Sequence, residues 1–254
     1  MTDIRKIIKL SPEVVGHIAA GEVVERPAAV VKELVENSMD AGATAITVDI
    51  RDGGLTLVRV VDNGSGIGDS ELRMAFERHA TSKLRTQEDL QRIGTLGFRG
   101  EALASIAAVA KVTLATRVRG AQSGMQVQND GGQITDIRPA ACAEGTTIWV
   151  KELFFNAPVR RKFIKKPAQE AQQVADLMQR LILSHPEISF RFVAEGKPVF
   201  FSPGDGKQET ALMSVWGINT LRLLTRVEGG ECGLLLSGFV GVGEAARGNR
   251  SQQL

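Results

Sequence analysis

Apolar residues recur along this chain with two different periods. Over residues 26–42 they return at every third or fourth position, which is typical of an amphipathic helix. Pro27 suits the first turn of such a helix, and Gly42 suits its left-handed end. The segments 45–52 and 55–61 alternate instead with a period of two, on either side of a Gly-Gly pair. These patterns predict a helix followed by a β-hairpin.

The same two patterns predict most of the remaining elements. A capped helix is expected after Ser11-Pro12, and the cations near residue 160 are expected to begin a helix that ends near Ser184. Further helices are expected at 70–78, 102–109 and 209–219. Strands are expected at 111–118, 146–151, 188–194, 198–201, 221–228 and 233–240, with a hairpin at 124–138. A linker containing proline and glycine at 202–207 separates the last elements from the others.

Composition narrows the class of protein. The chain has 254 residues, 43% of them hydrophobic and 24% charged, which fits a globular protein of one domain, or of one domain and part of a second. Its net charge of +2 is too small to indicate nucleic-acid binding by itself. No signal peptide and no membrane-spanning segment are predicted, so no membrane partner is expected. Cys142 and Cys232 lie far apart, and we interpret them as reduced, buried thiols of a cytoplasmic protein.

Three polar residues lie beside the apolar stripe of the helix at 26–42. At about 100° per residue, Glu33, Asn37 and Asp40 fall within roughly 60° of one another. A carboxylate and an amide held together at the edge of a buried face suit a base that deprotonates water and a ligand for a hard cation such as magnesium. The alternative is that they are ordinary solvated residues of an amphipathic helix.

An acidic residue follows the second strand of the hairpin. Asp62 is succeeded by a glycine-rich turn that includes Gly64, Gly66 and Ile67. A carboxylate at the end of a strand can accept a hydrogen bond from the exocyclic amine of adenine, and it would repel the carbonyl of guanine. A plain Asn-Gly turn is the alternative. Asp69 stands where a dinucleotide fingerprint needs its third glycine, and no P-loop motif occurs in the chain.

A second glycine-rich turn precedes the helix at 102–109. Backbone N–H groups at the start of a helix suit a phosphate, and the polar segment 84–95 ahead of the turn could close as a lid. The alternative is that the glycines only shape a turn. The residues of this candidate phosphate-binding turn are Gly97, Phe98, Arg99, Gly100, Glu101, Ala102 and Leu103.

These motifs together resemble a known superfamily. Glu33 and Asn37 on one helix, DNGSGI at 62–67, ATSK at 80–83 and GFRGEAL at 97–103 resemble the gyrase-type ATPases, which include heat-shock chaperones and histidine-kinase catalytic domains. IAAGEVVERP at 18–27 and LFFNAPVRRKF at 153–163 resemble the MutL family of DNA mismatch-repair ATPases more specifically. The resemblance implies an α/β fold: a mixed, mostly antiparallel sheet with helices on one face, holding ATP between them.

The resemblance also implies a role for each motif. Glu33 would be the general base, Asn37 the magnesium ligand, and Asp62 the residue that binds adenine, helped through water by Thr146 or Thr147. The other nucleotide-binding residues would be Asp40, Gly64, Gly66, Ile67, the lid residues Thr81, Ser82 and Lys83, and the phosphate-binding turn. His17, His79 and His185 lack the spacing of metal ligands, and we interpret them as structural.

A cluster of cations follows the LFFNAP segment. By itself it reads as the solvated start of a helix, but the resemblance suggests a share in binding DNA phosphates, without an element that reads bases. The cluster consists of Arg160, Arg161, Lys162, Lys165 and Lys166.

The resemblance implies a division into two domains. Residues 1–203 would form the ATPase domain, and 208–254 the beginning of a second domain of the ribosomal-protein S5-like type. In the family a lysine of that domain reaches the γ-phosphate, and a distal domain dimerises; neither has a counterpart here, so we expect a fragment with weak Mg-dependent ATPase activity.

The expected role is an ATP-gated DNA clamp that forms an ATP-dependent homodimer and works with MutS and downstream repair factors. A histidine-kinase catalytic domain and a scaffold that binds ATP without useful turnover are the alternatives. LFFNAPVRRKF, and the lack of a candidate phosphoacceptor helix, favour the MutL-like interpretation over the kinase.

Overall fold

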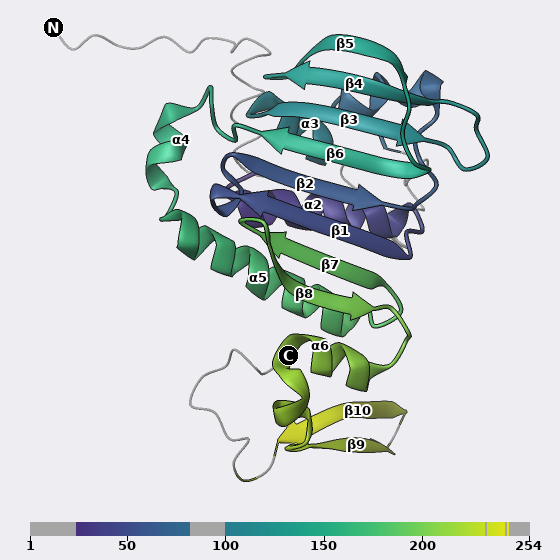
Figure 1. Ribbon diagram of the computed structural model, residues 1–254, viewed down its shortest axis with the longest axis vertical. Coiled ribbons are helices and arrows are strands. Elements are labelled where there is room, and N and C mark those ends of the chain that lie inside the picture. Colours follow the sequence, from purple (N-terminus) through teal and green to yellow (C-terminus); the bar gives the residue numbers. More distant parts are fainter. Residues whose placement is uncertain (1–23, 82–99, 232, 242, 244–254) are drawn as a thin grey trace, which may run out of the picture.

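A computed structural model describes residues 24–81, 100–231, 233–241 and 243. Its centre is an eight-stranded sheet in the order β5-β4-β3-β6-β2-β1-β7-β8, and the helices α2 and α3 lie together on one side of it (Figure 1). The strands are β1 (Ala45–Arg51), β2 (Leu57–Asp62), β3 (Lys111–Arg117), β4 (Gly124–Asp130), β5 (Gln133–Ala140), β6 (Gly145–Lys151), β7 (Ser189–Ala194) and β8 (Lys197–Pro203). The helices are α2 (Pro27–Asp40), α3 (Ala102–Ala108), α4 (Pro158–Phe163), α5 (Pro167–Ser184) and α6 (Gln208–Leu221).

Neighbouring strands of the sheet run antiparallel with a single exception. β1 pairs with β7 in parallel, and the other neighbouring strands of this described sheet pair antiparallel. The parallel pair arises because α4 and α5 connect β6 to β7, and this helical connection brings the chain back to the edge of the sheet beside β1. The predicted mixed, mostly antiparallel sheet with helices on one face is therefore confirmed.

The apolar stripe of α2 forms the middle of the core. Val30, Val31, Leu34 and Val35 are almost completely buried, in one cluster with inward residues of β1, β2, β6 and β7. α3 and α5 contribute to the same cluster, so the three helices cover one face of the sheet. Burial of this stripe, and not the helix propensity of its valines, holds α2 in place.

The predicted helix at 70–78 is wrong. That segment forms two short 3₁₀ turns, η2 (Asp69–Glu71) and η3 (Met74–Phe76). Leu72 is the only side chain of the segment that is fully buried, and it belongs to a small cluster apart from the main core. The segment buries little apolar surface, so little tertiary packing favours a continuous α-helix there.

The predicted single helix that begins near residue 160 is also wrong. The structure has two helices, α4 and α5, with extended backbone at Ile164 and Lys166 between them. Pro167 explains the break, because a proline disfavours helical backbone at the residue before it and suits the first turn of the next helix. Leu177, predicted to be buried, is only partly so.

The last described strands form a separate pair. β9 (Leu224–Glu231) and β10 (Leu234–Gly241) form a two-stranded antiparallel sheet beyond α6 (Figure 1). α6 itself packs on the main core through Ala211 and Leu212. Leu235 of β10 is 95% exposed, and its neighbours on either side are exposed too.

Several predictions lie outside the described residues. They concern the helix after Ser11, the lid segment 84–95, His17 and Cys232. Among the described helices, none is long and apolar enough to cross a membrane.

Candidate functional site

The site predicted from the sequence begins on α2. Glu33, Asn37 and Asp40 are half-buried on this helix, beside its fully buried stripe. The helix thus holds a carboxylate and an amide at the edge of the core, as their spacing predicts.

A lysine lies next to the candidate base. Lys32 Nζ lies 3.7 Å from Glu33 Oε1 and 2.9 Å from a carboxylate oxygen of Glu36, one turn further along α2. Burial lowers the pKa of Lys32, but the hydrogen bond and charge of Glu36, together with Glu33, outweigh it and raise that pKa above its ordinary value. Lys32 therefore stays protonated at neutral pH and places a positive charge beside Glu33.

Asp62, the last residue of β2, is held by three hydrogen-bond donors. Its Oδ1 accepts the backbone N–H groups of Gly64 at 2.9 Å and Thr146 at 3.1 Å. Its Oδ2 accepts the hydroxyl of Ser38 on α2 at 2.8 Å. A carboxylate offers about four acceptor positions. Within the described residues, one position on Oδ2 remains for a donor from outside the protein.

The turn after Asp62 has a structural part as well. Asn63 Oδ1 accepts the backbone N–H groups of Thr44 and Ala45, both at 2.9 Å. The Asn-Gly turn thus fastens the start of β1, while the preceding carboxylate faces the helix layer. The turn interpretation of this motif therefore holds for Asn63, and the binding interpretation concerns Asp62 alone and stays a prediction.

Thr146 and Thr147 lie on opposite faces of β6. Thr146 is directly opposite Asp62 in the register and is 8% exposed, whereas Thr147 is opposite Val61. Successive side chains of a strand alternate between faces. Thr146 therefore shares the inward face with Asp62, and Thr147 does not.

Two glycines let the backbone pack closely around Asp62. A Cβ atom on Gly145 would lie 2.2 Å from the Asp62 carbonyl oxygen, and one on Gly66 would lie 2.4 Å from that of Arg117. Both glycines also have positive φ angles, of +97° and +75°. Only glycine fits these positions without displacing the strand ends that surround the carboxylate.

The segments on either side of 82–99 meet each other. A Cβ atom on Gly100 would lie 2.6 Å from the Ala80 carbonyl oxygen and 3.1 Å from Thr81 Cβ. His79 Nδ1 lies 2.9 Å from Glu101 Oε1, so this histidine contacts a predicted site residue. Ala102 and Leu103 open α3 directly after this junction. Ser82, Lys83, Gly97, Phe98 and Arg99 lie outside the described residues.

Comparison of the sequence relates this chain to known ATPases and repair proteins. Residues 25–137 match the family model of histidine kinase-, DNA gyrase B- and HSP90-like ATPases. The chain is 47% identical over 245 residues to the DNA mismatch repair protein MutL of Pelotomaculum thermopropionicum, and 44% identical to HexB of Streptococcus pneumoniae. These matches cover 96% of this chain and 40% and 38% of those proteins.

Solved structures agree as well. The ADP complex of the Aquifex aeolicus MutL ATPase domain superposes with a TM-score of 0.68 at 31% identity, covering 82% of this chain and 73% of that one. The chain belongs to the MutL family. The N-terminal domain of a DNA repair protein gives a TM-score of 0.79 at 26% identity, covering 94% of this chain and 75% of that one. This MutL-family chain spans about 40% of the length of its curated relatives.

The side chains present suit a magnesium ion that is shared with a nucleotide. Among the described residues, no group of three or more His, Cys, Asp or Glu side chains could hold a metal by itself. Magnesium bound with a nucleotide takes one or two protein oxygens, and phosphates and waters complete its shell. The amide oxygen of Asn37, a hard donor on α2, fits that requirement.

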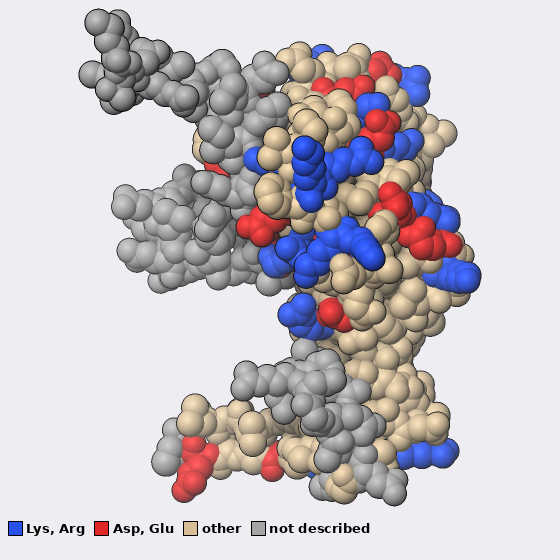
Figure 2. All heavy atoms as spheres, turned by 90° about the vertical axis from the view of Figure 1, so that its left-hand side faces the viewer, with Lys and Arg blue, Asp and Glu red and all other residues tan. Residues whose placement is uncertain are grey.

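The cation cluster of this MutL-family chain lies away from Asp62. Asp62 is opposite the first residues of β6, whereas α4 follows the other end of that strand. Lys and Arg side chains gather on the side of the molecule that carries α4, with acidic side chains between them (Figure 2). Arg160 is half-buried, and the other four cations of the cluster, Arg161, Lys162, Lys165 and Lys166, are exposed.

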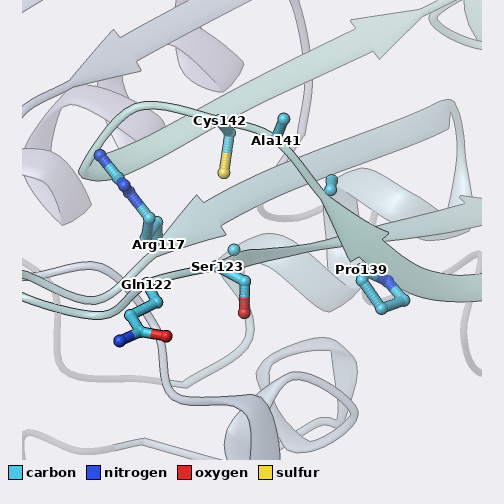
Figure 3. Close-up of a pocket in the computed structure, with 8 residues that line it drawn as sticks. Arg117, Gln122, Ser123, Pro139, Ala141 and Cys142 are labelled. Atoms are coloured by element: carbon cyan, nitrogen blue, oxygen red, sulfur yellow. The ribbon is translucent and has the colours of Figure 1, made fainter.

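A shallow cavity of about 400 Å³ lies at the ends of β3, β4 and β5. Arg117, Ser123 and Cys142 are among its lining residues (Figure 3). Its described lining includes none of the predicted nucleotide-binding residues, so it is distinct from the site around Asp62. Cys142, predicted to be buried, is half-buried.

Sequence reasoning missed two hydroxyl residues of the site, Ser38 and Thr116. Ser38 follows Leu34 by four residues, so it lies on the apolar stripe of α2, where a hydroxyl needs a partner. Thr116 likewise occupies an inward position of β3, after Val112 and Leu114. A polar residue at a position that the period assigns to the core is the signal that could have found both.

Proposed function

We propose that this chain binds ATP between α2 and the sheet and hydrolyses it with magnesium. The observation that carries the proposal is the arrangement at Asp62, where three protein donors orient the carboxylate and leave one acceptor position. The ADP complex of the related Aquifex aeolicus domain supports a nucleotide as the ligand.

The remaining acceptor position of Asp62 selects adenine. The exocyclic amine of adenine donates a hydrogen bond, whereas guanine presents a carbonyl oxygen that the carboxylate repels. Thr146, beside Asp62 on the inward face, assists through a water molecule. Gly64, Gly66 and Ile67 border the base.

Glu33 acts as the general base in this proposal. It takes a proton from a water whose oxygen attacks the γ-phosphorus, while the bond from that phosphorus to the bridging oxygen breaks and ADP leaves. Asn37 would hold magnesium, which offsets the negative charge of the phosphates. Asp40, Thr81 and the described part of the phosphate-binding turn, Gly100–Leu103, border the nucleotide. Contact of Ser82, Lys83 and Gly97–Arg99 with the nucleotide stays a prediction, since these residues lie outside the described part of the chain.

The role in the whole protein follows from its family. We infer an ATPase domain at 1–203, the start of an S5-like domain at 208–254, and a cytoplasmic repair protein whose nucleotide gates a DNA clamp. The proposal includes ATP-dependent homodimerisation and contact with MutS and downstream factors. It also includes binding of DNA phosphates by the α4 cluster.

A paired measurement tests the proposal. ATP is titrated against the chain with and without magnesium by calorimetry, and phosphate release is measured at the same concentrations. We expect saturable binding that magnesium strengthens, with slow release of phosphate. Absence of saturable binding contradicts the proposal, and binding without any release reduces it to a nucleotide-responsive scaffold.

A further inference from the structure

The Thr116 hydroxyl joins three segments of the chain next to the proposed adenine site. Thr116 is the penultimate residue of β3, and it is 1% exposed. Its Oγ1 accepts the backbone N–H of Ile67 at 2.9 Å. The same atom lies 3.0 Å from the Gly145 carbonyl oxygen and 3.1 Å from Thr146 Oγ1. The loop after β2, the end of β3 and the start of β6 thus meet at one atom.

The number of protons at this junction limits how Thr146 can be arranged. A hydroxyl has one proton and can accept two hydrogen bonds. If Thr116 donates to Thr146, the Thr146 proton is directed elsewhere, toward a water or a ligand. If Thr116 donates to the Gly145 carbonyl, Thr146 donates to Thr116 and offers only its lone pairs. In both cases Thr116 limits the directions that are open to the Thr146 hydroxyl proton.

Thr116 also fixes the backbone of the loop that follows β2. Its bond to Ile67 holds the residue that follows Gly66, where backbone atoms of β3 already pack against the glycine. Thr146 meanwhile gives its own N–H to Asp62. One buried hydroxyl therefore contacts both Thr146, which donates to the Asp62 carboxylate, and Ile67, in the loop that follows Asp62.

We propose that Thr116 is a positioning residue for nucleotide binding, which sets the Thr146 hydroxyl and the Ile67 backbone without touching the nucleotide itself. The inference rests on the proposed function, because it assumes that ATP binds beside Asp62. The inference goes beyond the proposed function by assigning part of the ATP affinity to a residue beneath the pocket.

Three variants at two positions test the proposal. Thr116→Val keeps the shape of the side chain and removes its hydroxyl, while Thr116→Ser keeps the hydroxyl. Thr113→Val is the matched control, because it removes a hydroxyl from the same strand at a position on the opposite face. We expect Thr116→Val to raise the Kd for ATP roughly 5- to 15-fold, and the other two variants to change it by less than about 2-fold.

A double-mutant cycle with Thr146→Val separates positioning from general damage. If Thr116 acts largely through Thr146, the added effect of Thr116→Val in that background falls below about 3-fold. An unchanged penalty in that background, or loss of affinity in Thr116→Ser, overturns the proposal. So does parental ATP affinity in a folded Thr116→Val.

Two further controls make the result decisive. If Thr116→Val does not fold, as judged by circular dichroism, Thr116→Cys replaces it, because a thiol is a poor hydrogen-bonding group. Folded Thr116→Cys should weaken ATP at least about 3-fold, and parental affinity overturns the inference. Failure of the unmutated chain to bind ATP contradicts the proposed function, whereas normal binding by folded Thr116 variants contradicts only the role of Thr116.

Discussion

The Ser38 hydroxyl lies 2.8 Å from Asp62 Oδ2 and joins α2 to the end of β2. The same hydroxyl is 3.1 Å from the Leu34 carbonyl oxygen, and its single proton can serve only one of these acceptors at a time. An ionised carboxylate is the stronger acceptor, so the proton goes to Asp62. This hydrogen bond therefore links the helix that carries the proposed base to the strand that carries the proposed adenine ligand, in addition to the apolar packing between them.

Removing this bond should weaken nucleotide binding. We expect Ser38→Ala to raise the Kd for ATP roughly 3- to 15-fold, because Asp62 loses one of the three donors that orient it. Ser184→Ala is the control, since that hydroxyl bonds a carbonyl one turn earlier on α5 and lies on an exposed residue. Calorimetric titration of both variants checks the prediction, and equal affinities would show that the bond does not orient Asp62 for ATP.

The hydrolytic role of Glu33 can be tested separately from binding. Glu33→Ala should leave ATP affinity near normal and lower the rate of hydrolysis about 100- to 10,000-fold, the usual contribution of a general base. Phosphate release by the parental chain and the variant is measured at the same protein, ATP and magnesium concentrations. Turnover at the parental rate would transfer the role of base to another residue.

The carboxylate of Asp62 should select the base. Asp62→Ala is expected to weaken ATP by roughly 1.5–3 kcal/mol, the range for hydrogen bonds to charged groups, and to change the weak binding of GTP very little. Asp69→Ala, in the exposed turn η2, is a control that removes a carboxylate nearby in the sequence. Equal losses for ATP and GTP would mean that the substitution damages the pocket and that Asp62 does not read the base.

Gly145 offers a test of the packing around Asp62. Gly145→Ala and Gly120→Ala both place a side chain at positive φ, but only at Gly145 would the new Cβ meet backbone, 2.2 Å from the Asp62 carbonyl oxygen. We expect Gly120→Ala to lower the free energy of unfolding by about 1 kcal/mol, and Gly145→Ala by at least about 2 kcal/mol more. Urea denaturation measures both values, and a similar loss in the two variants would show that the close approach costs nothing.

The α4 cluster should contribute to DNA binding through charge alone. Reversing Arg161 and Lys162 to Glu is expected to weaken duplex DNA and to reduce the salt dependence of its affinity by up to about two phosphate contacts. Reversing Arg191 and Lys197, which are equally exposed on β7 and β8, changes the net charge by the same amount elsewhere. Fluorescence anisotropy at several salt concentrations distinguishes the pairs, and equal effects would assign DNA binding to net charge and not to α4.

The sequence alone determined the features that depend on local order. The period of the valines in α2 placed Glu33 and Asn37 beside a buried face, and the alternating segments on either side of the Gly-Gly pair predicted the hairpin that ends at Asp62. The predicted two-residue turn is wrong, because a 3₁₀ turn at Asp52–Gly54 lengthens the connection and β2 begins only at Leu57. The motifs between Glu33 and Leu103 were enough to indicate the ATPase superfamily, and the segments at 18–27 and 153–163 indicated the MutL family. The sequence can determine these features because each depends mainly on residues that lie close together along the chain.

Tertiary structure decided which distant residues meet. β6 inserts between β2 and β3, and that insertion alone brings Thr146 opposite both Asp62 and Thr116. No period within one strand carries this information, because strand order depends on how apolar faces from the whole chain are buried together. Tertiary packing also explains why the predicted helix at 70–78 is absent from the structure. Its local pattern is helical, but the segment packs against little of the core.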